Sequence, residues 1–233
     1  MRLKIAVYSA ITGGYEPYRH NQNKNGAKFF MFSDRYEDSW TWQFYPSTKL
    51  FVDPRRNARY HKILPHEYFD DYDVTCWIDG SMEVKASLPY LIETWLPGYD
   101  CVVFKHPDRT CVYDEATVVK GKGYDHADVI DRQMAKYKDE GYPKNNGLSE
   151  TKIVMRYNTP EITKFNKLWF YELTTGSLRD QLSFDYCAWK TGLKVNRVPP
   201  MQEGQKGFVY YKHAKKEKKR IQLGSYPFQL IAA

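Results

Sequence analysis

Apolar and polar positions along this chain follow two periods, which alternate from the start of the chain to about residue 200. Short apolar runs with β-branched and aromatic members predict buried strands, and one run alternates as a half-exposed strand does. The predicted strands cover residues 4–10, 28–34, 40–45, 73–78, 100–105, 152–157 and 195–198. Amphipathic stretches predict helices, which cover residues 55–64, 88–96, 125–139, 159–175 and 177–191.

Several helix ends carry their own signals. Pro54 precedes the first helix, and the pair Thr159-Pro160 supplies an N-cap and a favoured first residue for a later one. Ser177 and Asp180 have the spacing of a capping box. This spacing gives Asp180 a structural role at a helix start, without any catalysis.

Strands that alternate with helices predict an α/β fold with a mainly parallel central sheet flanked by helices. No linker, repeat or change of composition divides the chain. We therefore predict one Rossmann-like domain over residues 1–200. Residues 201–233 form a basic C-terminal segment that we expect to pack on this domain or to close over it.

The buried run at 73–78 ends in Asp79, Gly80 and Ser81. An acid at the carboxyl end of such a strand lies where ligands bind in open α/β sheets, and its oxygens suit a divalent cation. The other interpretation is a simple turn that closes the strand. The local residues leave both interpretations open.

Basic residues recur on the helix just before this strand. Arg55, Arg59 and Lys62 share one face at helical spacing, and such a face could meet a diphosphate. An ordinary solvated helix face has the same pattern.

Two further loops carry polar residues after strands. Residues 11–15 form a glycine-bearing loop after the first strand, but their spacing matches neither a dinucleotide fingerprint nor a P-loop. His106, Arg109 and Glu115 follow the strand at 100–105. They predict either a polar site or an ion-pair network within a loop.

The composition and charge of the chain limit the classes of function that we expect. The 233 residues carry a net charge of +7, and many of the excess positive charges lie at 212–220, a run that suits an anionic surface or phosphate-bearing ligands. No RNA-recognition, KH or zinc motif supports nucleic-acid binding, so we expect no nucleic-acid partner. The four cysteines form no C-x-x-C pair and favour a reducing compartment. With neither a signal peptide nor a transmembrane segment in the pattern, we expect a cytoplasmic protein.

Six segments together resemble a glycosyltransferase-like family, formerly described as a domain of unknown function and related to GT-A fold nucleotide-sugar transferases. The matching segments are Ala6–Tyr15, Arg59–Pro65, Trp77–Ser81, His106–Glu115, Glu140–Pro143 and Arg179–Phe184. They follow one another in order over roughly the first 190 residues. The resemblance implies a single GT-A-like domain that takes a sugar from a nucleoside diphosphate donor, most simply a UDP-sugar.

The resemblance also implies roles for individual residues. Donor binding falls on Ala10, Thr12, Tyr15, Asp34, Arg59, Lys62, Asp79, His106 and Arg109. The D-x-D motif that holds Mn²⁺ or Mg²⁺ falls on Asp79-Gly80-Ser81, so Ser81 replaces the second acid. His213 is the candidate for a third metal ligand.

Asp180-Gln181 resembles the D-Q pair that lies beside the reacting sugar in related transferases. Breaking the anomeric bond develops positive charge on the sugar, which a carboxylate can stabilise, and a carboxylate can also activate the acceptor hydroxyl. Asp180 is the first candidate for this carboxylate, and Glu115 is the second. We predict a hexosyltransferase-type enzyme whose acceptor is a glycan or another hydroxyl compound.

Two other functions fit the same residues less well. A non-catalytic module that binds nucleotide sugars or glycans would explain the incomplete D-x-D motif. Nucleic-acid binding would explain the positive charge, and it predicts a steep dependence on salt.

Overall fold

The central sheet of the computed structural model contains seven strands, in the order β3-β2-β1-β4-β7-β6-β8. The structure describes residues 3–199 and 207–212. The strands are β1 (Ile5–Ile11), β2 (Lys28–Ser33), β3 (Trp42–Pro46), β4 (Val74–Ile78), β6 (Cys101–Lys105), β7 (Ser149–Tyr157) and β8 (Val195–Val198). Only β7 runs antiparallel to its neighbours in this sheet. The predicted α/β fold with a mainly parallel sheet is confirmed.

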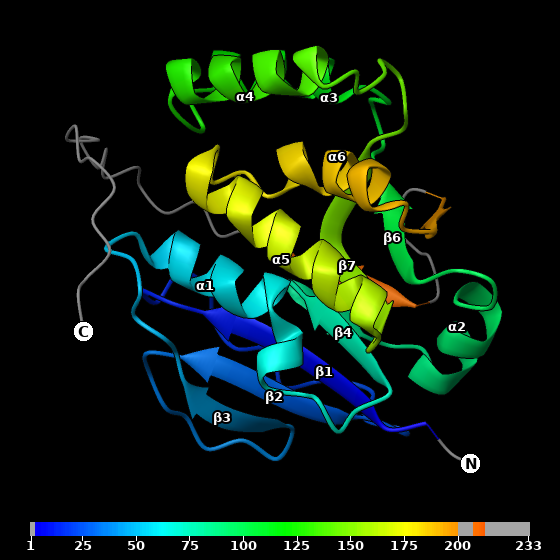
Figure 1. Cartoon of the computed structure of the whole chain (residues 1–233). Helices are drawn as coiled ribbons and strands as arrows, with labels where there is room; N and C mark the ends of the chain where they lie inside the picture. Colours follow the sequence, from blue (N-terminus) through cyan, green and yellow to red (C-terminus); the bar gives the residue numbers. More distant parts are fainter. Residues whose placement is uncertain (1–2, 200–206, 213–233) are drawn as a thin grey trace.

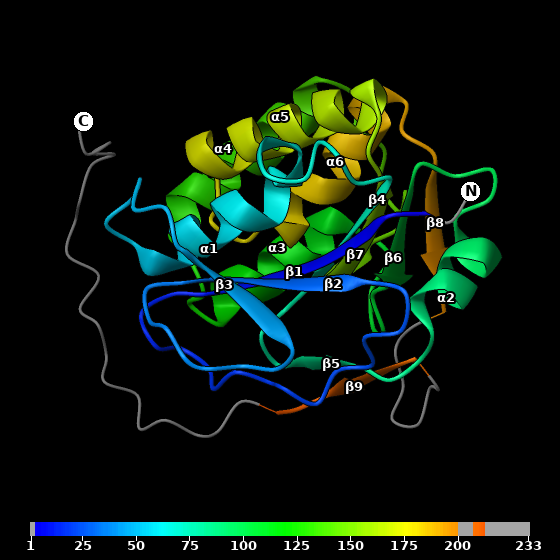
Figure 2. The ribbon, with the colours of Figure 1, turned by 90° about the horizontal axis from the view of Figure 1, so that it is seen from below.

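Helices cover the sheet unevenly. In Figure 1, α1, α5 and α6 lie over one face, and α3 and α4 form a further layer outside α6. Figure 2 shows a small second sheet, made of β5 and β9, beneath the opposite face. These elements are α1 (Pro54–Ile63), α2 (Leu88–Trp95), α3 (Val112–Gly121), α4 (Ala127–Asp139), α5 (Pro160–Thr175), α6 (Gln181–Thr191), β5 (Met82–Val84) and β9 (Phe208–Tyr210).

The two faces of the sheet bury separate apolar clusters, because side chains alternate between faces along a strand. Tyr8 and Trp77 belong to the cluster under α1, α5 and α6. Val7 and Cys76, one residue away on the same strands, belong to the cluster that also contains Phe208 of β9. Strand β9 therefore completes the apolar core on the second face of the sheet.

The strand order places a switch point between β1 and β4. Strands β2 and β3 follow on one side of β1, whereas β4 pairs with its other side, and all four are parallel. Ligands of open α/β sheets bind at the carboxyl ends of strands at such a point. Asp79 follows the last residue of β4 and therefore lies at this edge.

The structure corrects three local predictions. Residues 112–121 form α3, whereas the sequence pattern indicated a loop there. Helix α6 begins at Gln181 rather than Ser177, and the predicted capping box is wrong because the Ser177 N–H donates to Gln133 Oε1 rather than to Asp180. Strands β5 and β9, each three residues long, were not predicted because so short a run has no detectable period.

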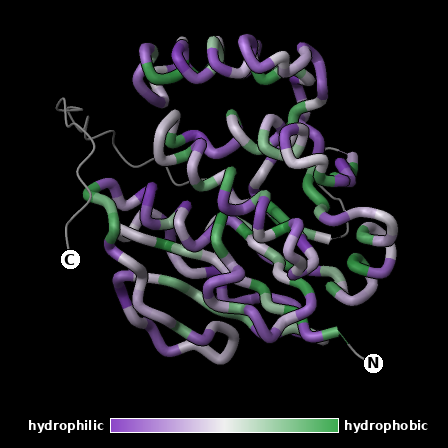
Figure 3. The backbone as a smooth tube through the Cα atoms, viewed as in Figure 1, coloured by the Kyte–Doolittle hydropathy of each residue, from purple (hydrophilic) through white to green (hydrophobic). Residues whose placement is uncertain are grey.

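The outer helix α4 is mainly polar on its exposed side and mainly apolar on its buried side. Figure 3 shows hydrophilic positions along the outer helix α4, with apolar ones at intervals. The buried residues of α4 recur at helical spacing, at Ile130, Gln133, Met134 and Tyr137. In residues 3–199 and 207–212, every helix is too short or too polar to cross a membrane.

Candidate active site

Asp79 is held at the carboxyl edge of β4 by its strand neighbours. Trp77 lies two residues earlier on the same face, and its Nε1 donates to Asp79 Oδ1 at 2.7 Å. The Asp79 backbone N–H donates to the carbonyl of Lys152 on β7 at 2.8 Å. Gly80 lies against β1 so closely that a Cβ there would be 2.9 Å from the Ile11 side chain. The glycine is therefore required by packing rather than by an unusual backbone angle.

Lys62 reaches this edge from the last turn of α1. Side chains of a helix point toward its N-terminus, which for α1 means toward the carboxyl edge of the sheet. Its ammonium Nζ lies 2.6 Å from Asp180 Oδ2 and 3.6 Å from Asp79 Oδ1. The residue is only 1% exposed. Lys62 therefore joins two carboxylates that are about 100 residues apart in sequence.

Asp180 receives a second cation. Its Oδ1 accepts from Arg59 Nε at 2.8 Å, and Thr151 donates to its Oδ2 at 2.9 Å. Trp169 of α5 donates to the Asp180 carbonyl at 2.9 Å, which fixes the backbone at this point. Burial acts to raise the pKa of Asp180, but Arg59 and Lys62 outweigh it and hold the pKa well below its ordinary value. Asp180 is therefore an ionised carboxylate at neutral pH.

The structure thus brings together four of the predicted site residues: Arg59, Lys62, Asp79 and Asp180. We call these four residues the charge quartet. Arg55, on the same predicted basic face, instead binds Asp53 at the N-terminus of α1. Sequence reasoning missed Thr151 and Trp77. Trp77 could have been found, because residues two apart on a strand share a face.

The predicted nucleoside loop lies after β1 at the same edge. Asp34 Oδ2 accepts from the Gly13 backbone N–H at 2.7 Å, so Asp34 shapes the glycine loop. Thr12 Oγ1 donates to the carbonyl of Pro54 at 2.6 Å and ties this loop to α1. Ala10 is buried within β1, whereas the Tyr15 side chain is exposed.

Glu115, His106 and Arg109 form a separate cluster at the end of β6. Arg109 Nε pairs with Glu115 Oε2, and His106 Nε2 lies 3.8 Å from the same oxygen. The His106 Nδ1 atom accepts the backbone N–H groups of Asp108 and Arg109, each at 3.1 Å. Burial lowers the pKa of His106, Glu115 acts to raise it, and the net shift is downward. Glu115 therefore stabilises the loop after β6 and has no ion pair with the charge quartet in the described part of the chain.

Gln181 follows Asp180 in sequence but has a different side-chain partner. It begins α6 directly after Asp180, and its Nε2 donates to the carbonyl of Ser149 at 2.9 Å. Its backbone position follows that of Asp180, but its side chain is turned toward the start of β7.

Asp79 is the carboxylate of the charge quartet that is best placed for a divalent cation, because both oxygens of Asp180 already contact Arg59, Lys62 or Thr151. In the described residues, the hydrogen bonds and ion pairs of the Asp79 carboxylate involve Oδ1, and its side chain is 27% exposed. No group of three His, Cys, Asp or Glu side chains with metal-site geometry occurs among residues 3–199 and 207–212. The Ser81 carbonyl accepts from the Tyr211 N–H at 2.9 Å, and His213 lies outside the described residues. One carboxylate is compatible with Mg²⁺-type binding that relies on substrate phosphates and water.

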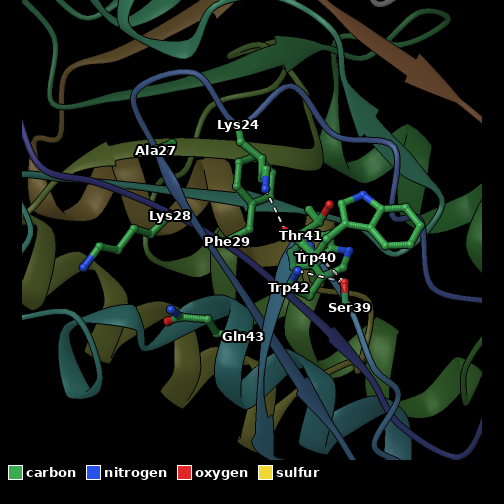
Figure 4. Close-up of a pocket in the computed structure, with 9 residues that line it drawn as sticks. All are labelled: Lys24, Ala27, Lys28, Phe29, Ser39, Trp40, Thr41, Trp42 and Gln43. Carbon is green, nitrogen blue, oxygen red and sulfur yellow. Dashed lines mark hydrogen bonds between the residues drawn. The ribbon is translucent and has the colours of Figure 1, made fainter.

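A shallow pocket of about 350 Å³ lies at the other end of the sheet, where β2 and β3 begin. Figure 4 shows Lys24 bonded to the Trp40 carbonyl and Lys28 pointing away from Trp40. Ser39 Oγ accepts the backbone N–H groups of Thr41 and Trp42. These contacts stabilise the loop before β3, so the pocket is not part of the candidate active site.

Curated relatives of the chain occur in Arabidopsis thaliana. A probable hexosyltransferase, MUCI70, is 27% identical and covers 93% of this chain, which corresponds to 43% of that protein. The alkaline ceramidase TOD1 is 25% identical over 60% of this chain and 33% of that protein. The chain therefore spans less than half the length of both relatives.

Solved glycosyltransferase structures are similar at low sequence identity. An enzyme involved in glycosylation of the major capsid of PBCV-1 has a TM-score of 0.49 and 10% identity, with 84% of this chain and 82% of that chain covered. Mouse xyloside xylosyltransferase 1 has a TM-score of 0.48 and 8% identity, with 84% of each chain covered.

A family model matches more than half of the sequence. The match covers residues 40–206 and includes β3 to β8, with Lys62, Asp79 and Asp180. The resemblance to a glycosyltransferase-like family is confirmed. The chain belongs to the TOD1/MUCI70 glycosyltransferase-like domain family.

Proposed function

We propose that this chain transfers a hexose from a nucleoside diphosphate sugar, most simply a UDP-sugar, to a hydroxyl group of a glycan or similar acceptor. The observation that carries the proposal is Lys62, a buried lysine that joins Asp79 and Asp180 at the carboxyl edge between β1 and β4. Buried charges of this kind concentrate at functional sites. The family assignment supports the same class of reaction.

The nucleoside would bind over the glycine loop at the ends of β1 and β2. Asp34 and Thr12 shape this loop through hydrogen bonds to Gly13 and Pro54. Exposed Tyr15 gives the loop an aromatic ring that a base can contact. The diphosphate would then lie toward Arg59 and Asp79.

Asp79 is the residue that would hold Mn²⁺ or Mg²⁺, with Ser81 and His213 as the other proposed ligands. Such a cation supplies positive charge that stabilises the leaving diphosphate. Ser81 is a weaker candidate, because it is 2% exposed and offers a neutral hydroxyl in place of a carboxylate. The proposal predicts that His213→Ala weakens Mn²⁺-dependent binding of UDP.

Asp180, Arg59 and Lys62 have different roles in stabilising the charges that develop during the reaction. Asp180 stays ionised because Arg59 and Lys62 hold its pKa low, so it cannot take a proton from an acceptor at neutral pH. We therefore assign it to electrostatic stabilisation of the positive charge that develops on the sugar. Arg59, whose side chain is 24% exposed, is the member of the pair that can reach the diphosphate.

The test compares matched variants of the full chain. UDP-, GDP- and dTDP-hexoses are supplied with and without Mn²⁺, and released nucleoside diphosphate is measured beside thermal shifts. Lys62→Met and Asp79→Ala should each lower release by about a hundred-fold, because the first removes the cation that positions Asp180 and the second removes the proposed metal-binding carboxylate. Lys120→Met makes the same substitution at a surface ion pair between α3 and α4 and should retain wild-type release.

Two results would contradict the proposal. Binding of a nucleotide sugar that shifts the melting temperature, without release in any acceptor mixture, would show a sugar-binding module. Hydrolysis of ceramide that Lys62→Met abolishes would instead assign the site to amide cleavage.

A further inference from the structure

Arg156 is an arginine in the middle of the protein that the proposed reaction does not use. It lies on β7, paired with Thr75 of β4 and Cys101 of β6, and is 0% exposed. Its Nη1 donates to Asn166 Oδ1 at 2.6 Å, and its Nη2 donates to the Lys62 carbonyl at 2.7 Å and to the Tyr8 hydroxyl. All of these partners are neutral groups.

No carboxylate pairs with Arg156 among the described residues, although a buried charge without an opposite charge is costly. The end of α1 explains how the charge is tolerated. The last carbonyls of a helix carry partial negative charge and lack partners within the helix. Arg156 binds two of them, those of Lys62 and Ile63. Its guanidinium also supplies the donor for Asn166 Oδ1, which a leucine or methionine would leave without this hydrogen bond.

The two ends of Lys62 are held by different groups. Its carbonyl accepts from both Arg156 and Tyr8, the latter at 2.9 Å. Its ammonium at the other end contacts Asp180, Asp79 and Thr151. Because these contacts fix the start of a long side chain, they determine how far the ammonium reaches along the sheet.

We propose that Arg156 is a positioning residue for Lys62. The fork of its guanidinium binds the end of α1 and Tyr8 of β1 together, and so places the Lys62 ammonium between Asp79 and Asp180. A lysine at this position would keep the charge but could not bridge both groups in the same plane. The inference rests on the proposed function, in which Lys62 acts at the reacting site.

The test uses Arg156→Lys, with Arg197→Lys as the matched control. Arg197 of β8 pairs with the fully buried Asp185, so the same substitution there also disturbs a buried charge. Turnover is measured with the nucleotide sugar that the wild type cleaves, at a temperature well below both melting transitions. Lys62 accessibility is measured separately by acetic anhydride labelling and mass spectrometry.

Arg156→Lys should lower kcat by about ten- to a hundred-fold with little change in KM, because a small misplacement at a reacting centre has that effect. Lys62, protected in the wild type, should become labelled. Arg197→Lys should retain kcat and leave Lys62 protected even where its melting temperature falls as far. Tyr8→Phe, which removes one hydrogen bond to the Lys62 carbonyl, should give a smaller change in the same direction.

Equal kcat and equal Lys62 protection in Arg156→Lys and Arg197→Lys would overturn the inference and leave a purely structural role. If Arg156→Lys does not fold, Tyr8→Phe decides by the same two measurements. Failure of the proposed function gives a different result, because the wild type itself would then release no nucleoside diphosphate, whereas Lys62 labelling in Arg156→Lys and Arg197→Lys would still differ.

Discussion

The role that the sequence predicts for Asp180 differs from the role that its contacts in the structure indicate. Its capping-box spacing predicted a helix start, and its resemblance to a D-Q pair predicted a place beside the sugar. In the structure its carboxylate makes no cap, and both oxygens contact groups on α1 or β7. The spacing could not reveal this, because the partners Arg59 and Lys62 are about 120 residues away in sequence.

Replacing Asp180 with asparagine tests this ion-pair arrangement. The change leaves Lys62 buried with Asp79 alone, and breaking a buried pair from one side costs about 3 kcal/mol of unfolding free energy. The folded pKa of Asp180 lies below its ordinary 3.8, so its contribution is present above pH 3.8 and is lost as the pH falls further. Urea unfolding from pH 7 to pH 3 should show the difference between wild type and Asp180→Asn narrowing toward pH 3.

The control is Asp70→Asn, at an exposed position outside the site. Its unfolding curves should follow the wild type at each pH. A constant difference between Asp180→Asn and wild type across the acid range would contradict the assignment of a lowered pKa to Asp180.

His61, the neighbour of Lys62 on α1, gives a second residue-level prediction. Its ring stacks on Phe32 at 4.1 Å, its Nε2 accepts from the Thr48 N–H, and burial lowers its pKa to about 4. Stability from the neutral ring is therefore present above pH 6.5 and is lost as the pH falls toward 4. Between pH 7.5 and 5 the wild type should lose about 2 kcal/mol of unfolding free energy through this group.

His61→Gln removes the titrating ring, so it isolates this contribution. Denaturant unfolding of the wild type and of His61→Gln at pH 7.5 and pH 5 gives the change in unfolding free energy of each protein over this interval. The wild type should lose more free energy than His61→Gln over this interval, and parallel losses would show that His61 does not titrate in that range.

Element positions were predictable where local signals and tertiary contacts agree. Thr159 caps α5 by accepting from the Ile162 N–H, and Gly192 ends α6 in a left-handed conformation, both as their residue types predict. Helix α3 was missed although its buried residues Val112, Ala116 and Val119 recur at helical spacing. The charged cluster before and within its first turn, where Arg109 pairs with Glu115, has the residue types of a polar loop.

The turn after β4 depends on Gly80, which supports a prediction for this element. A Cβ at residue 80 would lie 2.9 Å from the Ile11 side chain, so Gly80→Ala should reduce stability by about 1–3 kcal/mol through overpacking. The same substitution in an Ile11→Ala background should cost less, because the opposing atoms are gone. Thermal unfolding of the wild type, the two single variants and the double variant gives the coupling free energy between residues 11 and 80. Additive changes in unfolding free energy would contradict close packing of the turn against β1.

At the scale of the molecule, the sequence predicts the α/β class but not the strand order. Alternating strands and helices suffice for the class, whereas the antiparallel insertion of β7 between β4 and β6 depends on pairings far apart in sequence. That insertion decides the site, because the start of β7 brings Thr151 and Lys152 to the carboxyl edge of its neighbours. Pairing between strands that are distant in sequence thus brings Thr151 and Lys152 to the site, although no local sequence pattern predicts them there.

Strand β9 connects the late part of the chain to the candidate active site. Phe208 is 5% exposed and packs against Phe104, and the Tyr211 N–H three residues later donates to the Ser81 carbonyl. Removing the Phe208 ring should therefore loosen both the second core face and the turn after Asp79. Phe208→Ala is expected to cost about 3–5 kcal/mol, as for other buried phenylalanines.

Hydrogen exchange separates the local effect from this global loss. In Phe208→Ala, the Tyr211 and Met82 amides, which bond to Ser81 and Asp79, should lose protection before the amides of β1 do. Val209→Ala, at a position 37% exposed on the same strand, should leave both sets unchanged. Loss of protection at the same rate in β1 and in the turn would show that β9 contributes to overall stability without specifically holding the Asp79 turn.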